Sequence, residues 1–106
     1  MAKYLFVYHG GSMPETEEEG RQAMAAWRAW YESLGQAVKN PGSPVGKSST
    51  VSASGVTQDG GANPISGYSI IEAADQAAAE KIAARCPVID SNGSVEVAEV
   101  IVLNME

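Results

Sequence analysis

The last third of the chain carries the pattern that most constrains the fold. Gly67 leads into an apolar run over 68–73, which is typical of a strand. Asp75 is a favourable N-cap for a helix that continues up to Pro87, where proline ends it. The side chains that this helix turns inward are small and apolar, namely Ala78, Ala79, Ile82, Ala83 and Cys86. After a turn at 90–93, a final strand is predicted over 94–103.

The first third predicts another strand and another helix. A strand over 3–8 turns Tyr4, Phe6 and Tyr8 to one face and Leu5 and Val7 to the other. Because both faces are apolar, we expect this strand to be central and covered on both sides. If the helices cover the aliphatic face, the aromatic face needs a second copy of the chain to bury it.

The predicted helix begins after Pro14 and ends at Gly35. Thr16 and Glu19 are spaced as a capping box, and Gly35 is a natural left-handed stop. Apolar side chains recur at offsets of three and four along it: Ala23, Trp27, Trp30, Tyr31 and Leu34. Core packing is the more ordinary interpretation of such a stripe.

The middle segment, 36–66, has weaker patterns. Residues 40–44 and 58–64 are turn clusters, and 48–56 alternates as a half-polar strand suited to an edge. We expect this segment to be mobile and to shape specificity. The element order is then β-α-β-β-α-β, which predicts one α+β domain over 1–106 with the ferredoxin-like plan.

Composition excludes several classes of function. The net charge is −6 and the seven basic residues are scattered, which argues against a nucleic-acid partner. No apolar run reaches the roughly 20 residues that cross a bilayer, and the short apolar start does not resemble a signal peptide. We therefore expect a cytoplasmic protein without a membrane partner. The single cysteine, Cys86, excludes an internal disulfide, and we predict no metal and no cofactor.

Three segments resemble a known family: Gly67-Tyr68-Ser69-Ile70-Ile71-Glu72, Ala83-Ala84-Arg85-Cys86-Pro87 and Gly93-Ser94-Val95-Glu96-Val97. With them, the chain resembles the YCII-related domain family, nearest the branch named for an Asp-Gly-Pro-Phe motif. The resemblance implies a ferredoxin-like domain that dimerises with its sheets facing each other, of the dimeric α/β-barrel type. It also implies a pocket between sheet and loops, and by analogy of fold an isomerase-like activity on lactone or muconate compounds.

The chain departs from the family pattern in two places. Residues 59–62 read Asp-Gly-Gly-Ala, so the Pro-Phe half of the motif is missing. A His–Asp pair implied by a better-known branch has no counterpart, because Arg21 and Gln22 stand early in the first helix and Cys86 precedes Pro87. That pair is not carried over.

His9 is the only histidine and the first choice for proton transfer. It ends the first strand before Gly10 and Gly11, where a functional rim residue and a histidine bonded to a neighbouring loop are both reasonable. Its acidic partner would be one of four carboxylates: Asp59, Glu72, Glu96 or Glu99. Strand parity puts Glu96 and Glu99 on opposite faces. We choose His9, Glu72 and Asp59 as catalytic candidates.

The candidate ligand-binding residues are Tyr8, Tyr68, Trp30 and Glu96. Two hypotheses remain open: an enzyme that moves a proton on a small organic molecule, and a non-catalytic small-molecule-binding or accessory dimer. Residues 42–48 resemble a phosphate-binding loop, but they lack the four-residue spacing between the first glycine and the Gly-Lys pair. Cys86 is interpreted as a core residue whose pKa the helix C-terminus raises.

Overall fold

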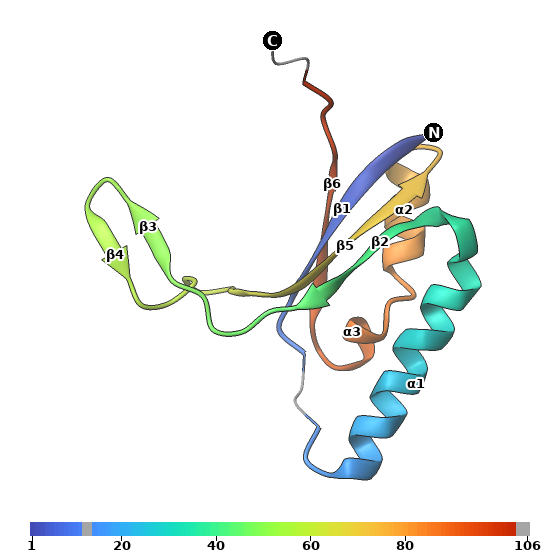
Figure 1. Ribbon diagram of the computed structural model, residues 1–106, viewed down its shortest axis with the longest axis horizontal. Coiled ribbons are helices and arrows are strands. Elements are labelled where there is room, and N and C mark those ends of the chain that lie inside the picture. The colour runs from blue at the N-terminus through green and yellow to red at the C-terminus, as the bar shows by residue number, and fades with distance from the viewer. Residues whose placement is uncertain (12–13, 104–106) are drawn as a thin grey trace.

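A computed structural model describes residues 1–11 and 14–103. Its helices and strands follow in the order β1 (Ala2–His9), α1 (Glu17–Leu34), the 3-10 turn η1 (Gly35–Ala37), β2 (Val38–Pro44), β3 (Thr50–Ser52), β4 (Gly55–Thr57), β5 (Ile65–Ala73), α2 (Gln76–Ala83), α3 (Pro87–Asp90) and β6 (Ser94–Glu99). The main sheet has the order β2-β5-β1-β6 and is antiparallel throughout, with the helices on one side of it (Figure 1). The class is α+β, and the strand order is compatible with the ferredoxin-like plan.

The core lies between the helices and the aromatic face of β1. Tyr4, Phe6 and Tyr8 are buried and pack with residues of the three helices, among them Trp30, Ala79 and Val88. Leu5 and Val7 are only half-buried on the opposite face. The prediction that β1 is central is confirmed, since it lies between β5 and β6. The suggestion that a second copy buries the aromatic face is wrong, because the helices of the same chain cover it. Burying large aromatic side chains removes more apolar surface from water than burying Leu5 and Val7 would.

The start and end of α1 agree with the sequence. The Thr16 hydroxyl accepts from the amide of Glu19 at 3.0 Å. The Glu19 carboxylate reaches back one residue further than predicted, to the amide of Glu15 at 2.8 Å. Gly35 ends the helix with a positive φ of 55°, which favours glycine, although its ψ of −124° differs from that of the predicted left-handed cap. Both ends of this long helix are therefore determined locally.

The turn predicted over 40–44 is wrong, because β2 runs through it to Pro44. The Asn40 side chain accepts from the amide of Gly42 at 2.8 Å, and the register with β5 shifts on both sides of this bulge. β2 lies at the edge of the sheet, where prolines are tolerated. The predicted half-polar strand over 48–56 is instead the hairpin β3–β4, a separate two-stranded arm that projects from the body (Figure 1).

The second half of the chain keeps its predicted order with different ends. Asp75 caps α2 by accepting from the amide of Ala78 at 2.8 Å. Pro87 does not terminate that helix; it is the first residue of the short helix α3, a position that suits its fixed φ. β6 ends at Glu99, before the predicted end at 103.

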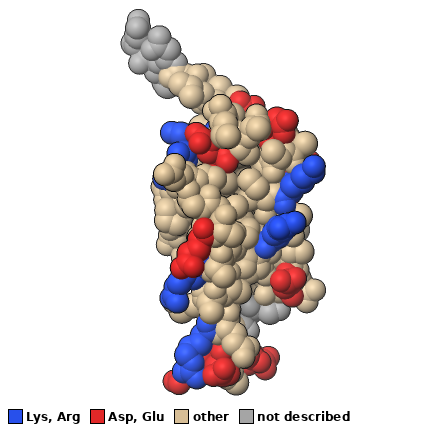
Figure 2. Space-filling model, turned by 90° about the vertical axis from the view of Figure 1, so that its right-hand side faces the viewer, with Lys and Arg blue, Asp and Glu red and all other residues tan. Residues whose placement is uncertain are grey.

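The surface that carries the helices mixes acidic and basic side chains (Figure 2). On this side neither sign forms a continuous field, as a phosphate-binding surface would require. In the described part of the chain, no helix is both long and apolar enough to cross a membrane.

Candidate functional site

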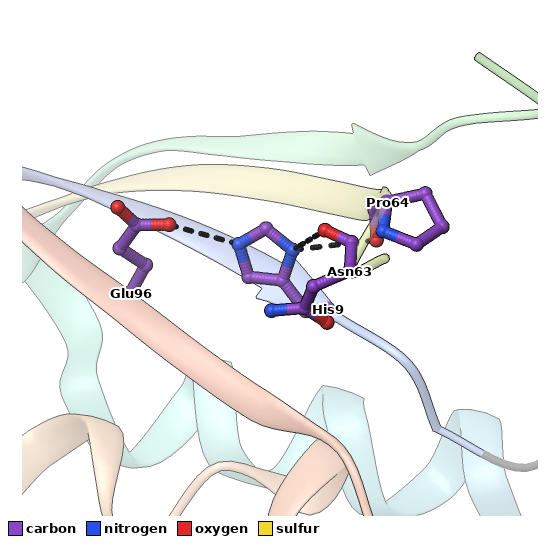
Figure 3. Close-up of polar contacts among 4 residues, drawn as sticks. All are labelled: His9, Asn63, Pro64 and Glu96. Atoms are coloured by element: carbon purple, nitrogen blue, oxygen red, sulfur yellow. Dashed lines mark hydrogen bonds and ion pairs between the residues drawn. The ribbon is translucent and has the colours of Figure 1, made fainter. Parts of the chain in front are cut away.

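His9 is held at both ring nitrogens, and one of the contacts is a carboxylate. Its Nε2 lies 2.9 Å from Oε1 of Glu96 on β6 (Figure 3). Its Nδ1 lies 2.9 Å from the carbonyl oxygen of Asn63 and 3.3 Å from that of Pro64, just before β5. The His9 side chain is 11% exposed, whereas that of Glu96 is 70% exposed. The imidazole is thus shielded while its acidic partner faces the solvent.

The contact partners determine which nitrogen of His9 can exchange a proton. A backbone carbonyl only accepts, so Nδ1 must carry hydrogen to bond with Asn63. In the neutral ring the lone pair is then on Nε2, the atom directed at Glu96. In the charged ring both nitrogens donate, and Nε2 forms an ion pair with the carboxylate. Nε2, the nitrogen without a hydrogen in the neutral ring, is thus the one directed at the Glu96 carboxylate.

The register of the sheet brings His9 and Glu96 together. His9 pairs with Ser94, and Val7 pairs with Glu96 on one side and with Tyr68 on the other. Residues directly opposite one another share a face, and the diagonal neighbour is within reach of a long side chain. The pair therefore lies on the sheet face that the helices leave open.

The other predicted acids lie elsewhere. Glu72 is opposite Lys3, at the other end of β1, and its Oε1 is 3.6 Å from Nζ of Lys39. Asp59 lies just after β4, where its carboxylate accepts from the amide of Gly61 at 3.1 Å. Glu99 is opposite Tyr4 on the helix-covered face. Of the four carboxylates weighed, Glu96 is the one at His9, and the predicted parity of Glu96 and Glu99 is confirmed.

The aromatic ligand candidates divide between the two faces. Tyr8 and Trp30 are 4% and 6% exposed in the core beneath the helices, whereas Tyr68 is half-buried on the open face. Tyr68, Val7 and Glu96 form one row across the sheet. Tyr68 is therefore the predicted aromatic residue that shares a face with His9.

The hydroxyl of Tyr8 belongs to a buried network that the sequence did not indicate. It donates to Oγ of Ser69 at 2.8 Å, and Ser69 donates to the carbonyl of Pro41 at 2.7 Å. The Tyr31 hydroxyl lies 2.8 Å from Oγ of Ser69 and 3.1 Å from the Pro41 carbonyl. Burial raises the pKa of Tyr8 well above its usual range. The one available signal in the sequence was Ser69 itself, a polar residue at a position of an apolar strand whose side chain points into the core.

Two surface hollows of the single chain lie away from His9. One, of about 180 Å³, is lined by residues of α2, α3 and β6, including Ala83, Ile89 and Val97. The other, of about 430 Å³, lies between the start of β1 and the chain after β6, including Ala2 and Ile101. Neither contains the His9–Glu96 pair.

Among the residues that the structure describes, no group of three or more His, Cys, Asp or Glu side chains is placed to hold a metal ion. Cys86 is 1% exposed, and burial raises the pKa of its thiol to about 11. The predicted direction is confirmed, but burial is its main cause and Cys86 precedes α3.

The fold and the site together define an α+β protein with an antiparallel sheet whose open face carries a His–Glu pair. The model of the YCII-related domain matches residues 4–104, so the chain belongs to the YCII-related domain family. No match was found among curated proteins or among solved structures.

Proposed function

We propose that the protein is an enzyme that moves a proton on a small organic molecule, with His9 as the base, in a site that a second copy closes. The observation that carries the proposal is the pair of His9 Nε2 and Glu96 at 2.9 Å, with the ring oriented through Nδ1 by Asn63. A histidine base is commonly oriented by an acceptor at its other ring nitrogen, and the carbonyl of Asn63 at Nδ1 has that position here.

The open sheet face supports the homodimer. Its centre is apolar: Leu5, Val7, Tyr68 and Ile70 are only half-covered within one chain, and Ala98 is exposed. Such a face is stable in water when another apolar layer covers it, and two sheets pack at about 10 Å. Two ferredoxin-like domains that meet in this way form a dimeric α/β barrel, with His9 and Glu96 between the sheets.

The reaction that suits this site is an isomerisation through an enolate. His9 Nε2 takes a proton from a carbon next to a carbonyl group, while Nδ1 keeps its hydrogen on Asn63. Glu96 swings aside for the substrate and stabilises the imidazolium, and Tyr68 can donate to the developing oxyanion. The His9 imidazolium, whose Nε2 proton can exchange with solvent, then protonates another carbon, so no oxidant or reductant is needed. Unsaturated lactones are the substrate class that we propose.

One observation favours a second candidate, a non-catalytic binding module. Both ring nitrogens of His9 are occupied and the two hollows described lie elsewhere. In that case the dimer interface would hold a ligand without reacting with it.

Proton exchange in D₂O distinguishes the two candidates. We would incubate the protein with a panel of unsaturated lactones and follow the loss of C–H signals by proton NMR. Enzyme function predicts exchange that His9→Gln abolishes and Glu96→Gln slows at least tenfold. Exchange that His9→Gln leaves unchanged would contradict the proposal. Shifted lactone signals without exchange would establish the binding module instead.

A further inference from the structure

The arm joins β5 through residues 58–64, a segment that we call the stem, and the end of the stem holds the ring of His9. The carbonyl oxygens of Asn63 and Pro64 lie 2.9 and 3.3 Å from Nδ1 of His9 (Figure 3). Glu96 competes for the ring hydrogen at Nε2, but its side chain is 70% exposed and can turn to water. The two backbone carbonyls can leave Nδ1 only if the stem moves. The position of the stem therefore decides how firmly Nδ1 keeps its hydrogen.

A bulge in β5 lies between the stem and the rest of the sheet. Tyr8 is opposite Gly67, whereas His9 is opposite Ile65, so Ser66 is an additional residue between two successive pairs. Bulges bend the strand that carries them, and they are frequent next to active sites, where they change the direction of side chains. The irregular pair in this sheet is thus the one that contains His9.

A tight turn at residues 59–61 folds the stem. The carboxylate of Asp59 accepts from the amide of Gly61 at 3.1 Å, and the Asp59 carbonyl accepts from the hydroxyl of Thr50 at 2.7 Å. A side chain that bonds to the amide two residues further on is common in turns, and the φ of 85° at Gly61 favours glycine. The turn is therefore fixed by its own contacts and by one contact with β3.

Gly60, in the middle of this turn, lies directly against Pro64. A Cβ at position 60 would lie 2.7 Å from Cβ of Pro64 and 3.1 Å from its Cα, and it would overlap the hydroxyl of Ser48. The Ser48 side chain can rotate away, whereas the ring of Pro64 can move only with its backbone. A side chain at position 60 would therefore displace the carbonyls that hold Nδ1 of His9.

We infer that the turn at 59–61 is a positioning element for His9, with Gly60 and Asp59 as its positioning residues. Gly60 leaves room for Pro64, and the Asp59 carboxylate closes the turn through the amide of Gly61. Asp59 then acts through an acceptor oxygen and not through its charge, in place of the catalytic role that the sequence suggested. The inference rests on the proposed function, in which the hydrogen on Nδ1 makes Nε2 the base, but the position of that hydrogen is measurable without a substrate.

The test is the tautomer of His9, measured by ¹⁵N NMR on the full chain labelled at histidine. His9 is the only histidine, so the spectrum contains one imidazole ring, and it distinguishes the nitrogen that carries hydrogen from the one that does not. The spectrum would be recorded at the alkaline end of a pH titration, where the ring is neutral. The variants are Gly60→Ala, Asp59→Ala and Asp59→Asn, and the control is Gly46→Ala, where a Cβ meets no neighbouring atom.

We expect the wild-type hydrogen on Nδ1. The ratio of the ring with hydrogen on Nδ1 to the ring with hydrogen on Nε2 should fall at least about fivefold in Gly60→Ala and about twofold in Asp59→Ala, because the bonds to the stem carbonyls are weakened. Asp59→Asn keeps an acceptor oxygen and should restore the wild-type ratio, whereas Gly46→Ala should not change it. Circular dichroism checks that each variant is folded, and the two Asp59 variants decide the matter if Gly60→Ala is not.

The outcomes separate this inference from the proposed function. A ratio that neither Gly60→Ala nor Asp59→Ala changes, or an equal loss in Asp59→Ala and Asp59→Asn, overturns the inference alone. A wild-type hydrogen on Nε2 overturns both, because Nε2 could not then be the base. The expected ratios without any proton exchange from the lactones support the inference and contradict the proposed function.

Discussion

Replacing Ser69 by alanine tests how the core holds β2 against the rest of the molecule. Ser69 is fully buried and its hydroxyl joins Tyr8, Tyr31 and the carbonyl of Pro41. Without it, Tyr31 keeps its contact with Pro41 at 3.1 Å, whereas the buried Tyr8 hydroxyl loses its acceptor. The substitution therefore leaves one buried donor, the Tyr8 hydroxyl, without an acceptor, while the contact between Tyr31 and Pro41 remains.

The magnitude follows from the groups that lose partners. An unsatisfied buried hydroxyl costs about 1–3 kcal/mol, and the lost bond to Pro41 adds about 1 kcal/mol. We expect Ser69→Ala to lower the free energy of unfolding by about 2–4 kcal/mol, a large part of the usual 5–15 kcal/mol. In a Tyr8→Phe background the same change should cost about 1–2 kcal/mol less, because no donor is then left unpaired.

Urea denaturation followed by tryptophan fluorescence measures this effect. Trp27 packs edge-on against Tyr8 at 5.0 Å between ring centroids, so the signal reports on the same region. Protein concentration must be constant, since self-association shifts the apparent stability. Ser52→Ala is the control, because that hydroxyl is exposed and contacts Ser54 on the arm. A loss below 0.5 kcal/mol for Ser69→Ala, or strict additivity with Tyr8→Phe, would refute the reasoning.

Three further predictions concern single residues. Because burial raises the pKa of Cys86 to about 11, the folded state favours the protonated thiol. The contribution of the protonated thiol to the free energy of unfolding is complete below pH 9 and falls by about 2–3 kcal/mol between pH 9 and 11. In urea titrations at several pH values, Cys86→Ala should reduce this pH dependence. Gly42→Ala should lower the free energy of unfolding by at least about 2 kcal/mol, because the φ of Gly42 is 71° and a Cβ there would overlap the carbonyl of Tyr68. As a control, Gly46→Ala should change the free energy of unfolding by less than about 0.5 kcal/mol, because a Cβ at that position meets no neighbouring atom. Asp75→Ala should lower the free energy of unfolding, measured by urea denaturation, by about 1 kcal/mol through the lost cap, and Asp75→Asn should restore most of it.

The elements that the sequence predicted correctly are those with local signals. Thr16 and Asp75 precede helices whose apolar residues recur every three or four positions, and their cap geometry depends on neighbours a few residues away. The main sheet has the predicted order β-α-β-β-α-β, but its second strand is β2 and not the segment 48–56 where the sequence placed it. β2 was missed because its Pro-Gly content indicates a turn, and only its edge position makes a bulged strand acceptable.

The site depended on contacts that no local pattern contains. Both faces of β1 are apolar, so parity could not decide which face the helices cover. His9 and Glu96 are 87 residues apart in sequence, and their contact follows from the pairing of β1 with β6. Alternation along β6 separates Glu96 from Glu99, but only the register of the sheet places Glu96, and not Glu72, next to His9.

Intermolecular NOEs would show whether a second copy closes the His9 site by covering the open sheet face. The sample would mix isotope-labelled and unlabelled chains, and the spectrum would be filtered for contacts between them. The account predicts intermolecular NOEs to the methyl groups of Val7 and Ile70. Intermolecular NOEs confined to α1, or none to the sheet face in a dimeric sample, would contradict it.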